Sequence, residues 1–224
     1  KKASWPIVTD GAFEQEPTEE LVEEFLTRVA HDGKLQVEGG ASINGQFLAS
    51  RPGAGANAFA VGAAAGLAGQ GVNSTAVGPG AGYSDQGDAA TAVGNSTGNT
   101  SQGDYATAVG VSAGQYTQGE SAVAIGNTAG QTSQGTGATA VGVSAGANTQ
   151  GAFATAVGVS AGQTNQAEFA VAVGRAAGST NQGSVAVAVG NFSGHTTQGD
   201  QAIAVGPSAG QHNQGANSIA IGNL

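Results

Sequence analysis

The sequence predicts an all-β protein, a parallel β-roll or β-solenoid built from 16-residue coils. Ala-Val-Gly or Ala-Ile-Gly returns with this constant period from residue 60 to residue 222, with no insertion or deletion, and a strict period of this kind indicates a repeat architecture. Small and β-branched residues alternate before each of these glycines, which is typical of a strand. Glycine recurs about three times in each unit, and that frequency disfavours a helix.

The chain divides into an N-terminal segment, residues 1–56, and a roll of about ten coils, residues 57–224. In the first segment Thr18 can cap a helix whose acidic first turn suits the helix dipole. A stripe of apolar residues follows, so we expect a helix at about 18–31 that stops at Gly33. One short helix cannot bury this stripe alone, so the segment is expected to trimerise or to attach the chain to a partner.

An extended stretch joins this helix to the roll. Lys34–Val37 and Gln46–Ala49 are strand-like, and Asn44-Gly45 between them is a turn sequence typical of hairpins. We therefore expect short strands on both sides of that turn.

Each coil is expected to contain two short strands and two tight turns. The glycine after Val or Ile and the glycine four residues later are present in every coil, which predicts positive φ or a lack of room for a Cβ. A glutamine also recurs without exception, and amides stacked about 4.8 Å apart can form a ladder. The structural repeat positions include Gly62, Gly78, Gly94, Gly110, Gly126, Gly142, Gln102, Gln118, Gln134, Val109 and Val141.

The two faces of the repeated strand differ in side-chain size. One face carries only alanine and serine, and the other carries Thr, Val, Ile or Phe. Either face could point inward, and we expect the thin coil to enclose little more than valine and alanine. Burying so little apolar surface, at about 25 cal/mol per Å2, barely offsets the entropy lost on ordering. A homotrimer, with the all-small face suited to close approach, would bury a second face of each roll.

Composition excludes several functions. Charged residues make up 9% of the chain, the net charge is −9, and there is no cysteine. Disulfides and thiolate metal sites are therefore ruled out, and no basic groove for nucleic acid is expected. No apolar run is long enough for membrane insertion. The chain starts without methionine and stops within a repeat, so we expect a segment of a longer fibre.

Carboxylates recur at one position, directly after the Gln-Gly step. Asp88, Asp104 and Glu120 occupy three consecutive coils and are expected to form a column. Such a column could hold a cation or contain a catalytic pair, although a solvated turn is the simpler interpretation. His195 and His212 lie one position out of register, which disfavours a metal site. We predict no catalytic residue, no cofactor and no enzymatic activity.

Four aromatic residues vary from coil to coil and could contact a ligand. They are Tyr83, Tyr105, Tyr116 and Phe192. Exposed rings could stack on sugars, but packing between subunits is also compatible with their positions. A column that contains threonine in five coils also suggests an ice-binding surface, while Val and Ile in the same column favour a half-buried position.

The repeat resembles the head repeat of YadA-type trimeric adhesins, which is also found in fibre proteins of bacteriophages and large viruses. The resemblance covers roughly residues 57–224, and Asn217–Gly222 is similar to the family's Asn-Ser-Val-Ala-Ile-Gly motif. It implies a left-handed parallel β-roll with three chains per rod. The family's heads usually have a slightly shorter repeat, so the 16-residue coil changes the turns.

We therefore expect a trimeric fibre segment of a phage or virus tail fibre that acts in host attachment. The N-terminal segment would bind virion or tail proteins, and the rod could bind a host-surface receptor or glycan, which places the protein in the virion or at the cell surface. A bacterial trimeric autotransporter adhesin head is the alternative within this class. An ice-binding solenoid and a polysaccharide-degrading tailspike are alternatives of other classes.

Overall fold

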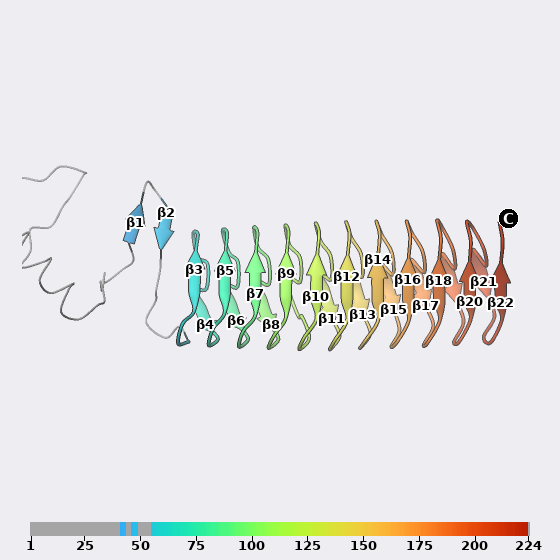
Figure 1. Cartoon of the computed structure of the whole chain (residues 1–224), viewed down its shortest axis with the longest axis horizontal. Coiled ribbons are helices and arrows are strands. Elements are labelled where there is room, and N and C mark those ends of the chain that lie inside the picture. The colour runs from blue at the N-terminus through green and yellow to red at the C-terminus, as the bar shows by residue number, and fades with distance from the viewer. Residues whose placement is uncertain (1–40, 44–45, 49–54, 224) are drawn as a thin grey trace, which may run out of the picture. The chain divides into compact units, whose positions relative to one another are not determined.

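The computed structural model describes residues 41–43, 46–48 and 55–223, and Figure 1 shows the stacked coils as a rod. The fold is a parallel β-solenoid of about ten 16-residue coils, as the repeat predicts. The described residues contain strands and turns but no helix. The helix expected at about 18–31 and the strand expected at Lys34–Val37 lie outside the described residues.

Every coil but one contributes two three-residue strands, one to each long side of the rod. The first sheet continues through β3 (Phe59–Val61), β5 (Thr75–Val77), β7 (Thr91–Val93), β9 (Thr107–Val109), β10 (Val123–Ile125), β12 (Thr139–Val141), β14 (Thr155–Val157), β16 (Val171–Val173), β18 (Val187–Val189), β20 (Ile203–Val205) and β22 (Ile219–Ile221).

The opposite side is divided into two sheets. One consists of β4 (Ala68–Gln70), β6 (Ser84–Gln86) and β8 (Thr100–Gln102). The other consists of β11 (Thr132–Gln134), β13 (Asn148–Gln150), β15 (Thr164–Gln166), β17 (Thr180–Gln182), β19 (Thr196–Gln198) and β21 (His212–Gln214). The coil between β8 and β11 has no strand on this side.

Successive coils stack in register. Thr139 pairs with Thr155 and Val141 pairs with Val157, and the same one-coil offset holds along the first sheet from β3 to β22. Turns pair as well, since the Ser144 N–H donates to the Asn127 carbonyl at 2.9 Å. Identical positions of neighbouring coils therefore lie directly over one another.

A hairpin precedes the first coil. β1 (Ala41–Ile43) and β2 (Gln46–Leu48) pair antiparallel across residues 44–45, and β2 pairs antiparallel with β3 through Leu48 and Val61. The strand expected after the turn is confirmed as Gln46–Leu48, and the Asn44-Gly45 turn lies outside the described residues. The strand before the turn is Ala41–Ile43, so the first sheet begins before residue 57.

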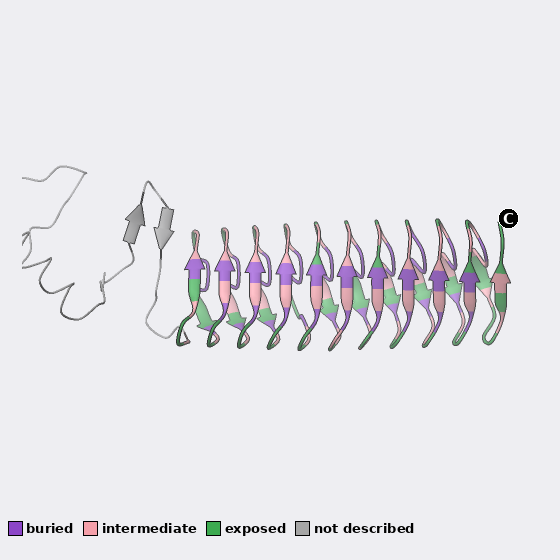
Figure 2. Ribbon diagram, in the orientation of Figure 1, coloured by how far each residue is buried: buried purple, intermediate pink, exposed green. Residues whose placement is uncertain are grey.

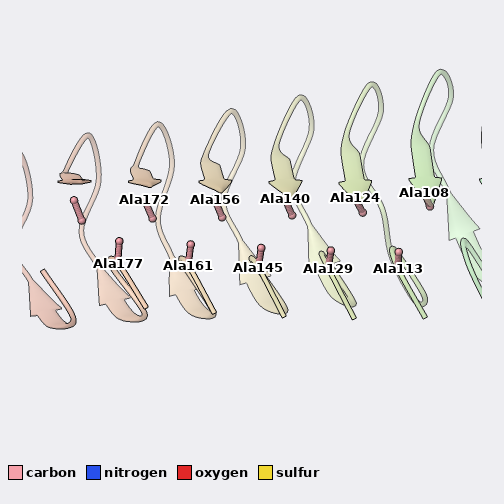
Figure 3. Close-up of a cluster of buried hydrophobic side chains, with 11 residues drawn as sticks. Ala108, Ala113, Ala124, Ala129, Ala140, Ala145, Ala156, Ala161, Ala172 and Ala177 are labelled. Carbon is pink, nitrogen blue, oxygen red and sulfur yellow. The ribbon is translucent and has the colours of Figure 1, made fainter. Parts of the chain in front are cut away.

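The interior of the rod consists of small side chains. Alanine from the middle of each first-sheet strand faces an alanine, serine or threonine from the following turn, and Figure 3 shows the two alanine rows pointing toward each other. The larger of two alanine clusters contains Ala108, Ala113, Ala124, Ala129, Ala140, Ala145, Ala156, Ala161, Ala172, Ala177 and Ala188.

The expectation of valine in the interior is wrong. Neighbouring strand residues point to opposite sides, so the valine or isoleucine after each buried alanine faces outward, and Figure 2 shows this alternation of buried and half-buried residues. The small face is therefore covered within a single chain. The sequence suggested that this face could pack between chains, but the structure leaves it unavailable for such contact.

The invariant glycines have the two predicted causes. Gly142 has φ 131°, and a Cβ there would lie 2.6 Å from the Gly158 carbonyl oxygen of the next coil. Gly146 has φ 51°, and its Cβ would lie 2.7 Å from Oε1 of Gln150. The first glycine lets coils approach, and the second leaves room for the glutamine side chain.

Candidate binding surfaces of the rod

The glutamine column lies inside the rod and satisfies backbone carbonyls. Nε2 of Gln150 lies 2.8 Å from the Thr139 carbonyl and 3.3 Å from the Ala154 carbonyl, both near it in the chain. It also lies 3.1 Å from Oε1 of Gln166 in the next coil. Because the same contacts recur, this column has a structural role.

The predicted amide ladder is confirmed for the C-terminal half of the rod. Amide-to-amide bonds link Gln134, Gln150, Gln166, Gln182, Gln198 and Gln214 in sequence. Gln102 and Gln118 donate to backbone carbonyls at 2.8–3.3 Å, but their buried Oε1 atoms have no hydrogen-bond partner. The N-terminal coils therefore have the glutamines without the continuous ladder.

The outer face of the first sheet is apolar and carries no charge. Its two outward columns contain only Thr, Val and Ile after Phe59 at the start. Val109 and Val141 belong to one of these columns and are half-buried in the single chain. This face runs along the whole described rod, so it offers a partner a continuous uncharged surface.

Two phenylalanines form an exposed ridge at the turn that leads into this face. The rings of Phe153 and Phe169 stack with centroids 5.5 Å apart and planes 12° apart, and the side chains are 54% and 52% exposed. Both residues have φ near 57°, a conformation that is unfavourable for a bulky residue. Other coils place Asn73 or Gly137 at this position, so the rings are not required by the turn.

The repeated carboxylates contact backbone. Oδ1 of Asp88 accepts from the Val72 N–H at 2.7 Å, and Oδ1 of Asp104 accepts from the Asp88 N–H at 2.9 Å. Asp200 makes the same contact with Ser184. Asp88, Asp104 and Glu120 do follow one another on consecutive coils, but residues 55–223 contain no cluster of three His, Cys, Asp or Glu side chains arranged to hold a metal ion.

Phe192 lies in a cluster within the chain. The Arg175 guanidinium lies 4.8 Å from the Phe192 ring centroid, and the His195 ring contacts Phe192 edge-on at 5.3 Å. His195 also lies edge-on to His212 at 6.4 Å. Burial, and then the nearby His212, lower the pKa of His195. These contacts give Phe192 a packing role.

The three tyrosines are separated by the fold. Tyr83 directly precedes β6, and Tyr116 lies two coils later in the column of Ser84, the first residue of β6. Both therefore lie on the side opposite the apolar face. Tyr105 lies at the turn on the other edge of the coil, in the same column as Phe153. Tyr83 and Tyr116 therefore share one side of the rod, and Tyr105 does not.

Fold and surfaces together define an all-β solenoid repeat protein with a buried amide column and one long apolar face. No protein-family model, curated protein or solved structure matches the chain. The described residues include no helix that is long and apolar enough to cross a membrane.

Sequence reasoning missed the phenylalanine ridge. Phe153 and Phe169 occupy the same position in successive repeats, so the repeat itself places them over one another. That spacing was the available signal.

Proposed function

We propose that the chain is a non-enzymatic segment of a homotrimeric fibre that acts in attachment to a host cell. The observation that supports this proposal most is the outer face of the first sheet, which is uncharged and lined by Thr, Val and Ile from β3 to β22. A continuous apolar face of this kind on a soluble protein marks an interaction surface. Three copies that run in parallel would cover it along the full length of the rod.

The phenylalanine ridge supports self-association. Phe153 and Phe169 lie one turn away from the apolar face, and their exposed rings enlarge its apolar surface. Large aromatic side chains contribute strongly to interfaces. The trimer and the left-handed winding follow from the resemblance to YadA-type head repeats, as does the assignment to a phage or virus tail fibre.

Partners and location follow from this assignment. The N-terminal segment would attach the rod to virion or tail proteins, and the rod would hold receptor-binding parts away from the particle. A bacterial trimeric adhesin head would use the same rod at a cell surface. A secretion signal and a membrane anchor in the same polypeptide would favour the adhesin over the tail fibre.

The trimer is tested by molar mass in solution. Light scattering coupled to size exclusion should give three times the chain mass for the unmodified protein. Val141→Asp together with Val173→Asp places charges on the apolar face and should produce folded monomers. Thr180→Asp lies on the opposite sheet and should leave the trimer intact. A folded, monomeric unmodified chain would exclude the proposed fibre.

The threonines of the apolar face favour ice binding as a second candidate function. Thr75, Thr91 and Thr107 are in register on adjacent strands, so their side chains repeat about every 4.8 Å, and they are half-exposed in the single chain. Inhibition of ice recrystallisation at micromolar protein, lost on Thr91→Lys, would support this function. A trimer that covers the face would leave no such activity.

A carbohydrate-cleaving tailspike gains less support from the structure. The oxygens of Asp88 and Asp104 accept backbone N–H groups, which is a structural role for them. Asp104→Asn keeps one acceptor oxygen. It should leave the fold unchanged, and any polysaccharide cleavage that it abolished would favour the tailspike.

A further inference from the structure

Tyr83 and Tyr116 share one side of the rod across three consecutive coils. Tyr83 directly precedes β6, and backbone bonds from Ser84 to Asn99 and from Thr100 to Gln115, both 2.9 Å, carry this register to the coil of Tyr116. The two tyrosines are thus offset by two coil spacings, about 10 Å along the rod. They are 40% and 49% exposed.

Polar side chains without positive charge lie between the tyrosines. Asn99 and Thr100 are half-buried on this side, and Gln115 follows in the next coil. Nδ2 of Asn99 donates to the Gly80 carbonyl at 2.9 Å, and Oε1 of Gln115 accepts from Nε2 of Gln131 at 2.9 Å. These bonds orient the two amides, and each amide keeps further hydrogen-bonding capacity.

The backbone departs from the repeat at Tyr116. The sheet on this side is divided there, with isolated bridges from Gln118 to Gln102 and Gln134. Backbone hydrogen bonds continue through the coil, as from the Gln118 N–H to the Ser101 carbonyl at 3.1 Å. Thr117 lacks the positive φ found at the same position in the other coils, including Thr149 and Thr197. Threonine adopts positive φ at this position in two other coils, and Asn213 does so after the His212 ring, so neither the residue type nor a ring before it accounts for the difference.

This departure from the repeat brings no visible packing gain, because the Tyr116 ring remains exposed. Local rules are broken at functional sites more often than elsewhere. An exposed ring offers an apolar face and a hydroxyl, and oriented amides and hydroxyls supply directional hydrogen bonds. This combination fits a ligand with alternating apolar and hydroxyl surfaces, which is a sugar chain.

We propose that Tyr83 and Tyr116, with Asn99 in the coil between them and Gln115 beside Tyr116, form a binding site for a neutral glycan. The one charged side chain among the outward residues on this side of these coils is Asp85, which can accept hydrogen bonds from sugar hydroxyls. Residues 83–118 contain no Lys, Arg or His, so an anionic ligand lacks a partner. The site rests on the proposed attachment function and deepens it, because it names the class of host molecule.

The site is tested by binding of neutral oligosaccharides to the full chain. Maltohexaose, cellohexaose, laminarihexaose and mannohexaose are titrated and followed by saturation-transfer NMR and calorimetry, with sialyllactose as an anionic arm. We expect at least one neutral probe to bind. Tyr83→Gln and Tyr116→Thr should each weaken it at least tenfold. Both changes introduce residues found in the same columns of neighbouring coils, as at Gln131 and Thr132, so the coils should still form.

Tyr105→Ser is the matched control. Tyr105 is the most exposed of the three tyrosines, at 64%, and its column contains Ser121, so this change should leave binding within twofold. Binding to none of the neutral probes, binding only to sialyllactose, or equal loss with Tyr105→Ser would overturn the site. Molar mass is measured on the same samples. A monomer with tyrosine-dependent binding would overturn the fibre and retain the site, whereas a trimer without binding would do the reverse.

Discussion

At the scale of single residues, the most unusual feature is a buried column of amides in a core otherwise made of alanine. Buried polar groups destabilise a protein unless they are hydrogen-bonded. Each glutamine from Gln86 to Gln214 meets this condition through two backbone carbonyls, as Gln150 does with Thr139 and Ala154. The amide therefore ties the strand to the turn that follows it, which alanine contacts alone would do weakly.

Replacement of Gln150 by Met should destabilise the rod more than the same change at Gln102. Met has a similar size but cannot donate, so the bonds to the Thr139 and Ala154 carbonyls are lost, at about 1 kcal/mol each. The Ala154 carbonyl keeps the Thr139 N–H as a donor. At Gln150 the bonds to both neighbouring amides are lost as well, whereas Oε1 of Gln102 has no partner to lose. Denaturant unfolding of both variants measures the difference, which we expect to be about 1 kcal/mol. Equal losses would show that the coil-to-coil amide bonds contribute nothing.

His195 should make the C-terminal coils sensitive to acid. Burial and His212 lower its pKa in the folded state, so the unfolded chain takes up a proton first as pH falls. Stability is therefore unaffected above the unfolded pKa of about 6.5 and declines as the pH falls below it. His195→Gln, which places the residue of Gln211 one coil earlier, should flatten the dependence of melting temperature on pH between about 7 and 5. A parallel pH dependence in that variant would assign the acid sensitivity to other groups.

At the scale of the strand, the rod is built from elements too short to persist alone. Each strand has three residues, and its ladder bonds are all to neighbouring coils. Alternation decides which residue is enclosed, and in the first-sheet strands from β3 to β20 it is the alanine. The space between strand and turn accepts one methyl group from each side, as for Ala156 and Ala161.

Ala156→Val should therefore destabilise the protein while Thr155→Val should not. Ala156 is fully buried, and two added methyl groups overpack the core at a cost of about 1–3 kcal/mol. Thr155 faces outward in a column that also contains Val171, so valine fits there. Thermal unfolding followed by circular dichroism compares the two. Tolerance of the Ala156→Val change would mean that the coils can separate to admit a larger side chain.

The sequence predicts the period, the strands and the roles of glycine and glutamine, because each depends on identical positions lying over one another. It does not predict which strand face is enclosed, because valine is more apolar than alanine and only the width of the coil excludes it. It also does not predict the break at Tyr116. Thr117 alone in its column lacks positive φ. The period describes what the coils share and says nothing about how one coil differs.

At the scale of the whole molecule, the rod is one-dimensional, so its length should be adjustable by whole coils. Deletion of residues 139–154 removes one unit and joins Ala138 to Thr155, so that Ala138 takes the position of Ala154. Every column then remains in register, and the rod should shorten by about 4.8 Å with its sheet signal per residue unchanged.

Deletion of residues 139–146 removes half a unit and is the matched control. It places the turn residues that begin at Ala147 where Thr139 had been, so glycines, glutamines and alanines no longer lie over their equivalents. A slip in register moves buried side chains to the surface, and the stack should be interrupted at that point. Small-angle scattering measures the length, and hydrogen exchange locates the interruption. Equal behaviour of the two deletions would contradict a rod held together by in-register stacking.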